Sequence, residues 1–377
     1  MYEMRVSGFL VIRCAHASET PIYFLPTMAG ARGSCPRIEA FLTFTPPAFR
    51  YPLSPKQTIL VDIMDSSGPI AIDFGSQDFR QILTNPFLDI AARFWEEKRY
   101  EAFKTCYRSM RRLDDLVDDR KVAGGTISST EREQYRTAML KWLESMRSQS
   151  AGDAYGIELL ETLDCFAIPL WPWERLCAAM IYDLDHDGFA NFRAFLRYSE
   201  GAAVAPASVF VHLCGVADDN SGRRRPPAFD IRRAARPLAL FAYVVHIMRD
   251  FQKDQLRGLN YYADDLLRKH SLTSEDLRRA ADGGPIPNGL RDLIEQYRTF
   301  ADYYRARART TLDGIAGHLE PRYQLSLEVI YGLYHLVFER IDPRGTRLSG
   351  ADFNPSAEEI QVRLQTIVTQ FKAHNSL

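Results

Sequence analysis

The sequence has few cysteines, and none stands where a zinc site or a disulfide framework would need it. No Cys-x-x-Cys pair occurs, which removes the usual spacing of structural zinc ligands and of dithiol redox motifs. Isolated cysteines in apolar helical segments are typically buried thiols. We therefore expect free, buried cysteines and a reducing, cytoplasmic location. The cysteines are Cys14, Cys35, Cys106, Cys165, Cys177 and Cys214.

Long apolar runs and a strong net charge are also missing. No apolar stretch approaches the roughly 20 residues that span a bilayer. The run at residues 8–12 is too short for the core of a signal peptide and is followed by Arg13. We therefore expect a soluble protein. The formal net charge is −1, so no overall field favours nucleic acid or an anionic membrane as partner. No Gly-x-Gly-x-x-Gly pattern is present, so no Rossmann-type nicotinamide site is indicated.

Proline is concentrated near the N-terminus and divides the chain. Residues 1–72 are rich in proline and hold no helical period, which predicts an N-terminal extension of unknown role, formed by a few short strands, a loose arm or a poorly ordered segment. From about residue 77, apolar residues recur at spacings of three and four, between Gly/Pro/Asp loops. We therefore predict one all-α domain over residues 73–377. The predicted helices are 86–95, 97–120, 130–149, 153–165, 171–182, 189–213, 229–256, 273–282, 289–318, 321–341 and 355–373.

Four aspartates fall within six residues, at Asp114, Asp115, Asp118 and Asp119. On a helix, Asp114 and Asp118 project from one face, one turn apart. Like charges at that spacing destabilise a helix, so the cluster needs either full solvation or a bound divalent cation. Apolar residues interleave with the acids, which argues against a uniformly exposed face. Hard cations such as Mg²⁺ bind carboxylate oxygens, so a metal site is indicated.

A second acid pair, Asp250 and Asp254, repeats the same spacing at the end of an almost wholly apolar stretch, residues 238–248. An acid pair that emerges from a buried helix is costly unless it has partners. Neighbouring basic residues would make it a structural ion network, and divalent cations would make it a second metal-binding cluster. The basic candidates are Arg249, Lys253 and Arg257.

Two acid-bearing helices in one helical protein favour the second interpretation. Facing each other, they can hold Mg²⁺ ions that neutralise a substrate diphosphate and make it a leaving group. Arginine and lysine side chains can hold the phosphate oxygens. The allylic carbocation that remains requires a dry, apolar and aromatic pocket. The apolar segments 189–213 and 321–341 can supply its walls.

The two clusters resemble the signatures of a known family. Arg111-x-x-Asp114-Asp115-x-x-Asp118 resembles the first signature of the squalene/phytoene synthase family. Arg249-Asp250-x-x-x-Asp254, followed by Arg257-Gly258 and Tyr261, resembles its second. The segment 192–204, in which a tyrosine precedes small residues, resembles the central helix that lines the family's tunnel. The resemblance covers about residues 77–345, and the order and spacing of the motifs are specific.

The resemblance implies an isoprenoid synthase fold, a helical bundle around a central cavity. It implies head-to-head coupling of two allylic isoprenoid diphosphates through a cyclopropyl intermediate. Mg²⁺ would be the cofactor, with Mn²⁺ as a substitute, and NADPH would enter only if the intermediate is reduced. By position, the implied metal ligands are Asp114, Asp118, Asp250 and Asp254; the catalytic residues are Tyr107, Arg111, Asp115 and Tyr261; the substrate-binding residues are Arg249, Arg257, Tyr198 and Tyr243.

The chain departs from the family pattern at several positions. Tyr243 and His246 stand where the family commonly has Gln and Asn. That Asn commonly helps to hold a metal, and His246 could replace it as a softer ligand. Leu259 replaces an arginine, and residues 84–87 (Thr-Asn-Pro-Phe) replace a serine-rich diphosphate segment. One of the two diphosphate subsites is therefore expected to be altered.

One further motif resembles half of a calcium-binding loop. Asp183-Leu-Asp185-His-Asp187-Gly188 copies the start of an EF-hand, but Ala194 stands where a bidentate Glu would be required. We expect a helix end and a turn instead, with Asp183 near the mouth of the cavity.

Three functions remain open from the residues alone. The first is a prenyl transferase of terpenoid or carotenoid biosynthesis that makes a C30 or C40 hydrocarbon or a presqualene-type diphosphate. The second is a terpene cyclase that uses one diphosphate on the same scaffold, and the third is a non-catalytic assembly or binding factor. A lipid product would be compatible with loose association with a membrane surface.

Overall fold

The computed structural model describes residues 58–61, 70–73, 86–218, 224–345 and 348–375. The chain divides into two units, Met1–Arg50 and Tyr51–Leu377, and every described residue belongs to the second. Strand β1 (Thr58–Val61) pairs antiparallel with β2 (Ile70–Asp73), which agrees with short strands in the N-terminal region. The remainder of the predicted extension lies outside the described residues, and its boundary at residue 72 stays a prediction.

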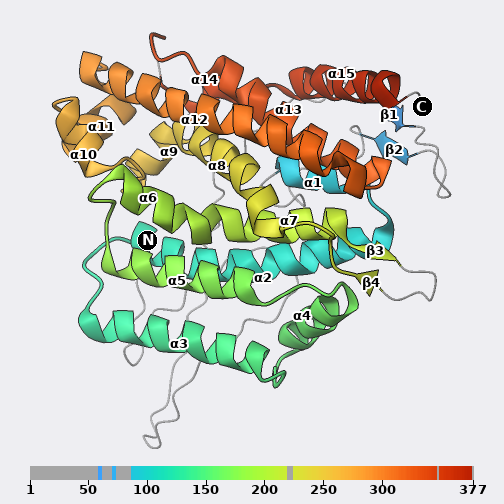
Figure 1. Ribbon diagram of the computed structural model, residues 1–377. Helices are drawn as coiled ribbons and strands as arrows, with labels where there is room; N and C mark the ends of the chain where they lie inside the picture. The colour runs from blue at the N-terminus through green and yellow to red at the C-terminus, as the bar shows by residue number, and fades with distance from the viewer. Residues whose placement is uncertain (1–57, 62–69, 74–85, 219–223, 346–347, 376–377) are drawn as a thin grey trace, which may run out of the picture. The chain divides into compact units, whose positions relative to one another are not determined.

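The rest of the described chain is almost entirely helical, as predicted (Figure 1). The only sheet besides β1–β2 in the described ranges is the two-residue pair β3–β4. The elements are α1 (Pro86–Ala92), α2 (Glu97–Val122), α3 (Ser129–Arg147), α4 (Ala154–Cys165), α5 (Trp171–Asp185), α6 (Phe192–Ser199), the π-helical turn η1 (Glu200–Val204), α7 (Ala205–Gly215), β3 (Ala217–Asp218), β4 (Arg224–Arg225), α8 (Ile231–Arg249), α9 (Phe251–Leu256), α10 (Asp264–Lys269), α11 (Ser274–Ala281), α12 (Asn288–Ile315), the 3₁₀ turn η2 (Ala316–His318), α13 (Pro321–Arg340), α14 (Gly350–Phe353) and α15 (Ala357–Asn375).

Polar caps explain where several of these helices begin. A short side chain just before the first turn accepts a hydrogen bond from a free backbone N–H of that turn, which would otherwise lack a partner. Thr273 and Asp276 form a reciprocal capping box at the start of α11. The other side chains that cap in this way are Ser128, Asp153, Asn191, Asp230 and Ser349.

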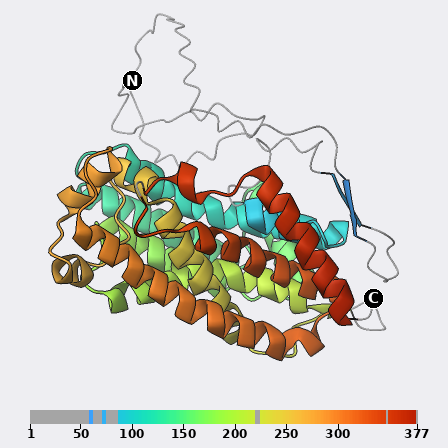
Figure 2. The same cartoon turned by 90° about the horizontal axis from the view of Figure 1, so that it is seen from above.

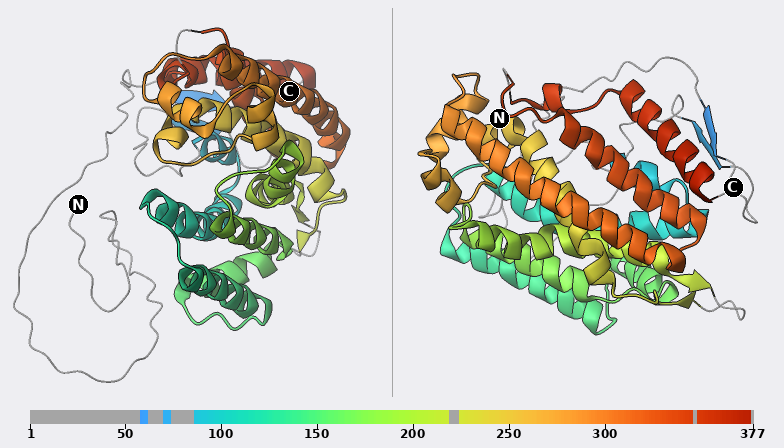
Figure 3. Two further views of the ribbon diagram at one scale, coloured as in Figure 1. Left: turned by 90° about the vertical axis from the view of Figure 1, so that its left-hand side faces the viewer. Right: turned by 45° about the horizontal axis from the view of Figure 1, so that its top comes forward.

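The helices form a bundle in which α7 and α8 are central (Figures 1 and 3). Helix α8 packs against α12, α7 and α13, and α2 packs against α5, α4 and α7. Helix α3 covers α5, and α15 covers α13; Figure 2 shows α12, α13 and α15 towards the viewer. None of the helices in the described ranges is both long and apolar enough to cross a bilayer.

Two helices that were predicted as continuous are interrupted. The predicted helix 189–213 contains the π-helical turn η1. A Cβ on Gly201 would lie 2.3 Å from the carbonyl oxygen of Arg175, so only glycine permits this close approach of η1 to α5. The predicted helix 229–256 is broken at Asp250, which has φ −91° and ψ 7°. The spacing of apolar residues predicts neither interruption, because the apolar positions continue through both.

Three smaller expectations also changed. Helix α10 was not predicted, and α14 lies in a predicted loop. Among the described cysteines, Cys106, Cys177 and Cys214 are buried free thiols as expected, whereas Cys165 is exposed. Cys165 is the last residue of α4, where the apolar face of the helix ends.

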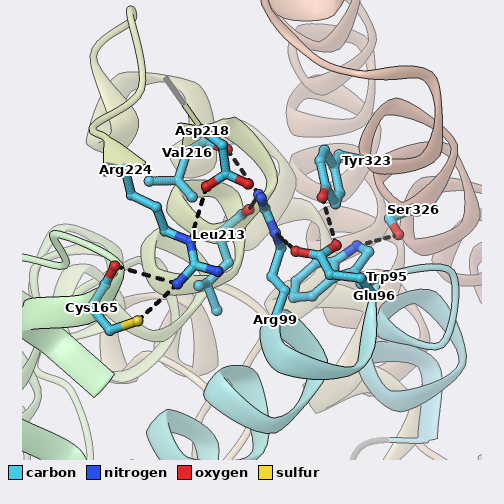
Figure 4. Close-up of polar contacts among 10 residues, drawn as sticks. All are labelled: Trp95, Glu96, Arg99, Cys165, Leu213, Val216, Asp218, Arg224, Tyr323 and Ser326. Carbon is cyan, nitrogen blue, oxygen red and sulfur yellow. Dashed lines mark hydrogen bonds and ion pairs between the residues drawn. The ribbon is translucent and has the colours of Figure 1, made fainter. Parts of the chain in front are cut away.

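A buried arginine joins three helices at the N-terminal end of α2 (Figure 4). Arg99 is 1% exposed, and its Nη1 donates to the carbonyl oxygens of Leu213 and Val216 at the end of α7. Its Nε donates to Glu96 Oε1 at 2.7 Å, and its guanidinium lies 4.0 Å from the ring centre of Tyr323. The cation therefore satisfies helix-terminal carbonyls that have no other helical partner.

We predict that Arg99→Met lowers the free energy of unfolding by about 3 kcal/mol, the lower end of the range for breaking a buried ion pair. Chemical denaturation monitored by circular dichroism measures the change. Arg147→Met is the matched control, because Arg147 pairs with Glu144 and Glu174 while its side chain is 52% exposed, and it should leave the midpoint almost unchanged. Equal effects of the two substitutions would show that the Arg99 network is not a structural support.

Candidate active site

One cavity of about 550 Å³ is lined by α2, the α6–η1–α7 segment, α8, α9, the loop that follows α9, and α13. It brings together every residue that the sequence analysis assigned to catalysis, substrate or metal. The segments expected to form apolar walls contribute Ala202, Ala207, Leu327 and Ile330. The roles of the assigned residues stay predictions, but their common location is a property of the fold. They are Tyr107, Arg111, Asp114, Asp115, Asp118, Tyr198, Tyr243, His246, Arg249, Asp250, Asp254, Arg257 and Tyr261.

The first acidic cluster lies on α2, where Asp114 and Asp118 line the cavity one turn apart. Arg111 spans two carboxylates: its Nη1 donates to Asp114 and its Nη2 to Asp115. Within the described part of the chain, no ion pair reaches Asp118. The cluster therefore carries more negative charge than its own arginine neutralises.

Burial and this surplus of negative charge raise the pKa values of the aspartates in the cluster. Burial raises the pKa of Asp114 to about 6, although the Arg111 guanidinium opposes the shift. The pKa of Asp118 rises to about 7, because the negative charges of Asp114 and Asp183 reinforce the effect of burial. A cation beside these carboxylates would relieve the repulsion that holds both values high.

The second cluster stands where α8 gives way to α9. Asp250 ends α8 and directly precedes α9. Its Oδ1 accepts from Arg249 Nε at 2.7 Å, and its Oδ2 lies 3.0 Å from His246 Nε2 and 3.5 Å from Lys253 Nζ. Burial alone would raise the pKa of Asp250, but His246 and Arg249 hold it well below its usual range. Two of the basic residues expected as partners are thus in place.

His246 contacts Asp250 through one ring nitrogen and keeps the other for a further interaction. Burial lowers the pKa of His246, so the ring is neutral near pH 7. Because Asp250 is ionised, the hydrogen of their bond comes from His246 Nε2, and the ring's lone pair is on Nδ1. An imidazole that donates to a carboxylate is the common arrangement of a metal-binding histidine. The role of His246 as a metal ligand stays a prediction, and Nδ1 is the ring atom that would bind the cation.

Asp254 lies one turn beyond Asp250 on α9, and no ion pair reaches it from the residues that the structure describes. Burial and the charge of Asp250 raise the pKa of Asp254 to about 7. Gly258, with φ +76°, ends this segment in the left-handed conformation that favours glycine. The chain then turns so that Tyr261 lines the cavity, while Arg257 is exposed at its mouth.

Three tyrosines form the middle of the cavity wall. The ring centres of Tyr243 and Tyr261 are 6.3 Å apart, and Tyr243 stacks on Phe195 at 5.8 Å. Burial raises the pKa of Tyr198, Tyr243 and Tyr261 well above the usual value. These hydroxyls therefore stay protonated, and the wall presents neutral aromatic surface next to the acids.

Sequence analysis did not assign a role to the ion pair of Asp183 and Lys121. Asp183 is buried on α5; its Oδ2 accepts from the Tyr198 hydroxyl at 2.5 Å and its Oδ1 from Lys121 Nζ at 3.3 Å. Lys121 also donates to the carbonyl of His186 at 2.9 Å. The calcium-loop resemblance is explained by a helix, since α5 continues through Asp185. No local pattern joins Lys121 to Asp183, which are 62 residues apart.

Two of the departures from the family pattern can be located. Leu259 lines the cavity, so an apolar side chain stands where the family commonly has a cation. Tyr243 also lines the cavity, and the charges of Asp183, Asp114, Asp118 and Asp254 add to burial in raising the pKa of its hydroxyl. Thr84 and Asn85, at the start of the replaced diphosphate segment, lie outside the described residues.

The donor set fits Mg²⁺ bound together with a substrate. In the described ranges, no three His, Cys, Asp or Glu side chains stand close enough to hold a metal ion by themselves. Mg²⁺ is usually held by one or two carboxylates and by substrate phosphate oxygens rather than by an all-protein cage. Acids also outnumber permanent cations in the cavity wall: Asp114, Asp115, Asp118, Asp119, Asp250 and Asp254 against Arg111, Arg249, Lys253 and Arg257.

Comparisons with known proteins agree with this geometry. A family model described as squalene/phytoene synthase matches residues 89–362. The crystal structure of a dehydrosqualene synthase in complex with ligand superposes with a TM-score of 0.61 at 14% sequence identity, covering 77% of this chain and 93% of that one. At that identity, the likeness shows the isoprenoid synthase fold.

Two further solved structures are similar at lower TM-scores. Squalene synthase HpnC from Alicyclobacillus acidocaldarius has a TM-score of 0.49 at 17% identity, covering 70% of this chain and 99% of that one. YisP from Bacillus subtilis subsp. subtilis strain 168 has a TM-score of 0.45 at 14% identity, covering 71% and 97%. No curated protein sequence matches the chain.

We predict that MgCl₂ with inorganic pyrophosphate raises the melting temperature more at pH 8 than at pH 5.5. The pKa values of Asp114, Asp118 and Asp254 lie at about 6, about 7 and about 7 in the folded state. Because these values exceed that of an unfolded aspartate, about 3.9, the contribution of these groups to stability falls as the pH rises from about 4 to 7. Cation binding requires the ionised forms, so it stabilises the protein most above that window.

Differential scanning fluorimetry at matched ionic strength measures both shifts. The double variant Asp118→Asn/Asp254→Asn should lose most of the difference between the two pH values. An equal shift at pH 5.5 and pH 8 in the unmodified protein would contradict cation binding at these carboxylates.

Proposed function

The chain belongs to the squalene/phytoene synthase family, and on that premise we propose that it is an active prenyl transferase. It condenses two allylic isoprenoid diphosphates head to head, with Mg²⁺ as cofactor and Mn²⁺ as a substitute. The product is of the squalene, phytoene or presqualene diphosphate type. The observation that carries the proposal is a single cavity that joins two acidic clusters to a long apolar and aromatic interior.

The acidic clusters would hold the cofactor. Asp114 and Asp118 from α2, and Asp250, Asp254 and His246 from α8–α9, offer the oxygen and nitrogen donors that line the cavity. Bound Mg²⁺ supplies charge neutralisation of the diphosphate, which makes it a better leaving group. Asp183 with Lys121 fixes the Tyr198 hydroxyl beside this region, so the wall next to the acids is held in one orientation.

The basic residues would bind and orient the diphosphate. Arg111 is held by Asp114 and Asp115, and Arg249 is held by Asp250. A guanidinium already oriented by carboxylates loses less conformational freedom when it binds phosphate oxygens. Lys253 and Arg257 are exposed at the mouth, where they can meet a diphosphate as it enters.

The reaction forms two carbon–carbon bonds at C1 of the first substrate, while that substrate loses its diphosphate and one proton. The C1–O bond of the first substrate breaks, and its electron pair leaves with the diphosphate. The C2–C3 double bond of the second substrate attacks C1 of the allylic cation, which leaves a tertiary cation at C3 of the second substrate. Loss of a proton from C1 of the first substrate then lets the electrons of that C–H bond form a bond to C3, which closes a cyclopropane ring. Neutral tyrosine rings stabilise such cations through their π faces, and Tyr198, Tyr243 and Tyr261 are neutral because burial raises the pKa of each.

One observation favours a second candidate, a cyclase that uses a single diphosphate. An engineered cavity of about 150 Å³ accommodates benzene, or about 25 Å³ per carbon atom. The cavity volume of about 550 Å³ then holds about 22 carbon atoms, which suffices for one C15 or C20 chain. Two chains require the cavity to widen, whereas a single chain does not.

Product analysis separates the two candidates. We predict that the purified protein with Mg²⁺ and farnesyl or geranylgeranyl diphosphate releases pyrophosphate and forms a C30 or C40 product, detected by mass spectrometry. Parallel reactions with and without NADPH distinguish a reduced product from an unreduced one. A cyclic C15 or C20 product would establish the cyclase instead, and no turnover of either substrate would contradict both.

Loss of the unpaired carboxylates tests the cofactor's position. We predict that Asp118→Asn and Asp254→Asn each lower kcat by about 10² to 10³-fold, the range found when one preorganised electrostatic contact is removed. Excess MgCl₂ should restore part of the rate if binding of the cation is what is lost. Asp302→Asn, at a carboxylate on α12 that is 54% exposed, is the control and should leave kcat unchanged. Wild-type rates in both cavity variants would contradict the assignment.

A further inference from the structure

A second cavity, of about 840 Å³, is lined mainly by α5, the loop that follows it, α6, η1 and the start of α10. Figure 1 shows α5 and α6 side by side, with α10 near one end. None of the acids or cations assigned to the first cavity lines the second, and among the described residues Tyr198 is the one that both linings share. The second cavity is therefore a separate candidate site, which the proposed function does not use.

An aromatic platform forms part of this lining. The imidazole of His186 stacks on the ring of Tyr182, with centres 3.9 Å apart and planes within 7°. His186 is exposed although Tyr182 covers one of its faces, so the opposite face is the one on which a planar ligand can stack. Both rings are held in place: His186 Nδ1 donates to the carbonyl of Tyr182 at 2.9 Å, and the Tyr182 hydroxyl donates to the carbonyl of Gly188 at 3.3 Å. A platform fixed in advance loses little conformational freedom on binding.

Two cations in the lining are available to a ligand. Arg175 on α5 and Arg197 on α6 line the cavity and are exposed, and within the part of the chain that the structure describes neither forms an ion pair. Two acids of the lining, Asp185 and Glu200, are already neutralised by arginines that lie outside it. Guanidinium groups match the geometry of phosphate oxygens, so the two unpaired arginines favour a phosphate-bearing ligand.

Two further acids show that the ligand is more than a bare anion. Asp187 and Asp264 also line the cavity, and no ion pair reaches either of them from the described ranges. The backbone N–H of Asp264 donates to the carbonyl of Phe189 at 2.8 Å, which fixes the loop after α5 to the start of α10. Ionised carboxylates only accept hydrogen bonds, so these two favour a ligand that carries hydroxyl donors as well as phosphate. A nucleotide combines a planar base, ribose hydroxyls and phosphate.

The dimensions of the cavity fit a mononucleotide. At about 25 Å³ per non-hydrogen atom, the about 27 such atoms of ADP need about 680 Å³, whereas the about 48 atoms of NADPH need about 1,200 Å³. The cavity volume of about 840 Å³ accommodates the first and not the second. Arg175 precedes Tyr182 by seven residues on α5, or about 10 Å along the helix. The seven bonds from ribose C1′ to the β-phosphorus advance by about 8 Å, which brings the phosphates within reach of an arginine side chain.

We infer that this second cavity binds a nucleoside diphosphate. The base stacks on the open face of His186, and the phosphate groups bind Arg197 and Arg175. The ribose hydroxyls donate hydrogen bonds to Asp187 and Asp264. The inference does not depend on the proposed function, because these residues have no part in it.

Isothermal titration calorimetry with ADP in EDTA tests the site, since the absence of divalent cations removes metal-dependent binding of diphosphate at the acidic clusters. The unmodified protein should bind one ADP per chain, at least about tenfold more tightly than inorganic pyrophosphate, because stacking of one base contributes a factor of that order. His186→Ala and Arg197→Met should each weaken ADP binding about tenfold, whereas His186→Phe, which keeps an aromatic ring, should retain most of it. Arg193→Met is the matched control: Arg193 is exposed on α6, one turn before Arg197, and does not line the cavity.

Each other outcome overturns the inference. No binding of ADP, or unchanged binding in both His186→Ala and Arg197→Met, removes the site. Pyrophosphate that binds as tightly as ADP shows a simple anion site, and NADPH that binds more tightly than ADP contradicts the size of the ligand. An equal loss of affinity in Arg193→Met shows that the overall surface charge, rather than this cavity, attracts the nucleotide. Circular dichroism spectra that match the unmodified protein establish that each variant is folded.

Discussion

The surplus of negative charge between α2 and α8–α9 is the constraint on which the site depends. Carboxylates buried in an apolar bundle need a cation, a hydrogen-bond donor or a proton. Asp250 has donors and stays ionised, whereas burial and neighbouring charge raise the pKa values of Asp118 and Asp254 to about 7. These two side chains are therefore the places where an external divalent cation changes the energy most. Under the proposed function, Mg²⁺ that binds together with the substrate diphosphate would supply the cation that these carboxylates need.

The Arg99 network at the N-terminal end of α2 contains a buried charge that the protein itself satisfies. Arg99 is more deeply buried than the acids, but Glu96, two carbonyls and the Tyr323 ring surround its guanidinium. A network with every partner present stabilises the fold and has no need of a ligand. The contrast explains why one charged cluster is a candidate site and the other a support for the packing of α2, α7 and α13.

The likeness to a dehydrosqualene synthase at 14% identity shows how little of the sequence this bundle requires. Helix packing depends on where apolar side chains fall and on their volume, and both survive extensive substitution. The reaction depends on a few side chains instead. The altered positions here, Tyr243, His246 and Leu259, all line the cavity, so under the proposed function they would bear on the choice of substrate and product.

Local sequence patterns determined the helices, the two aspartate pairs and their basic neighbours, because each depends on residues within one or two turns. The interruptions at η1 and Asp250 escaped prediction, since they follow from how α5 and Gly201 approach and from the side chains around Asp250. Only the tertiary structure placed Lys121 against Asp183, and Trp95 against Phe103 and Phe210. Those contacts join residues far apart in the chain. The spacing of apolar residues predicts which face of a helix is buried, but it does not predict which distant side chain packs against that face.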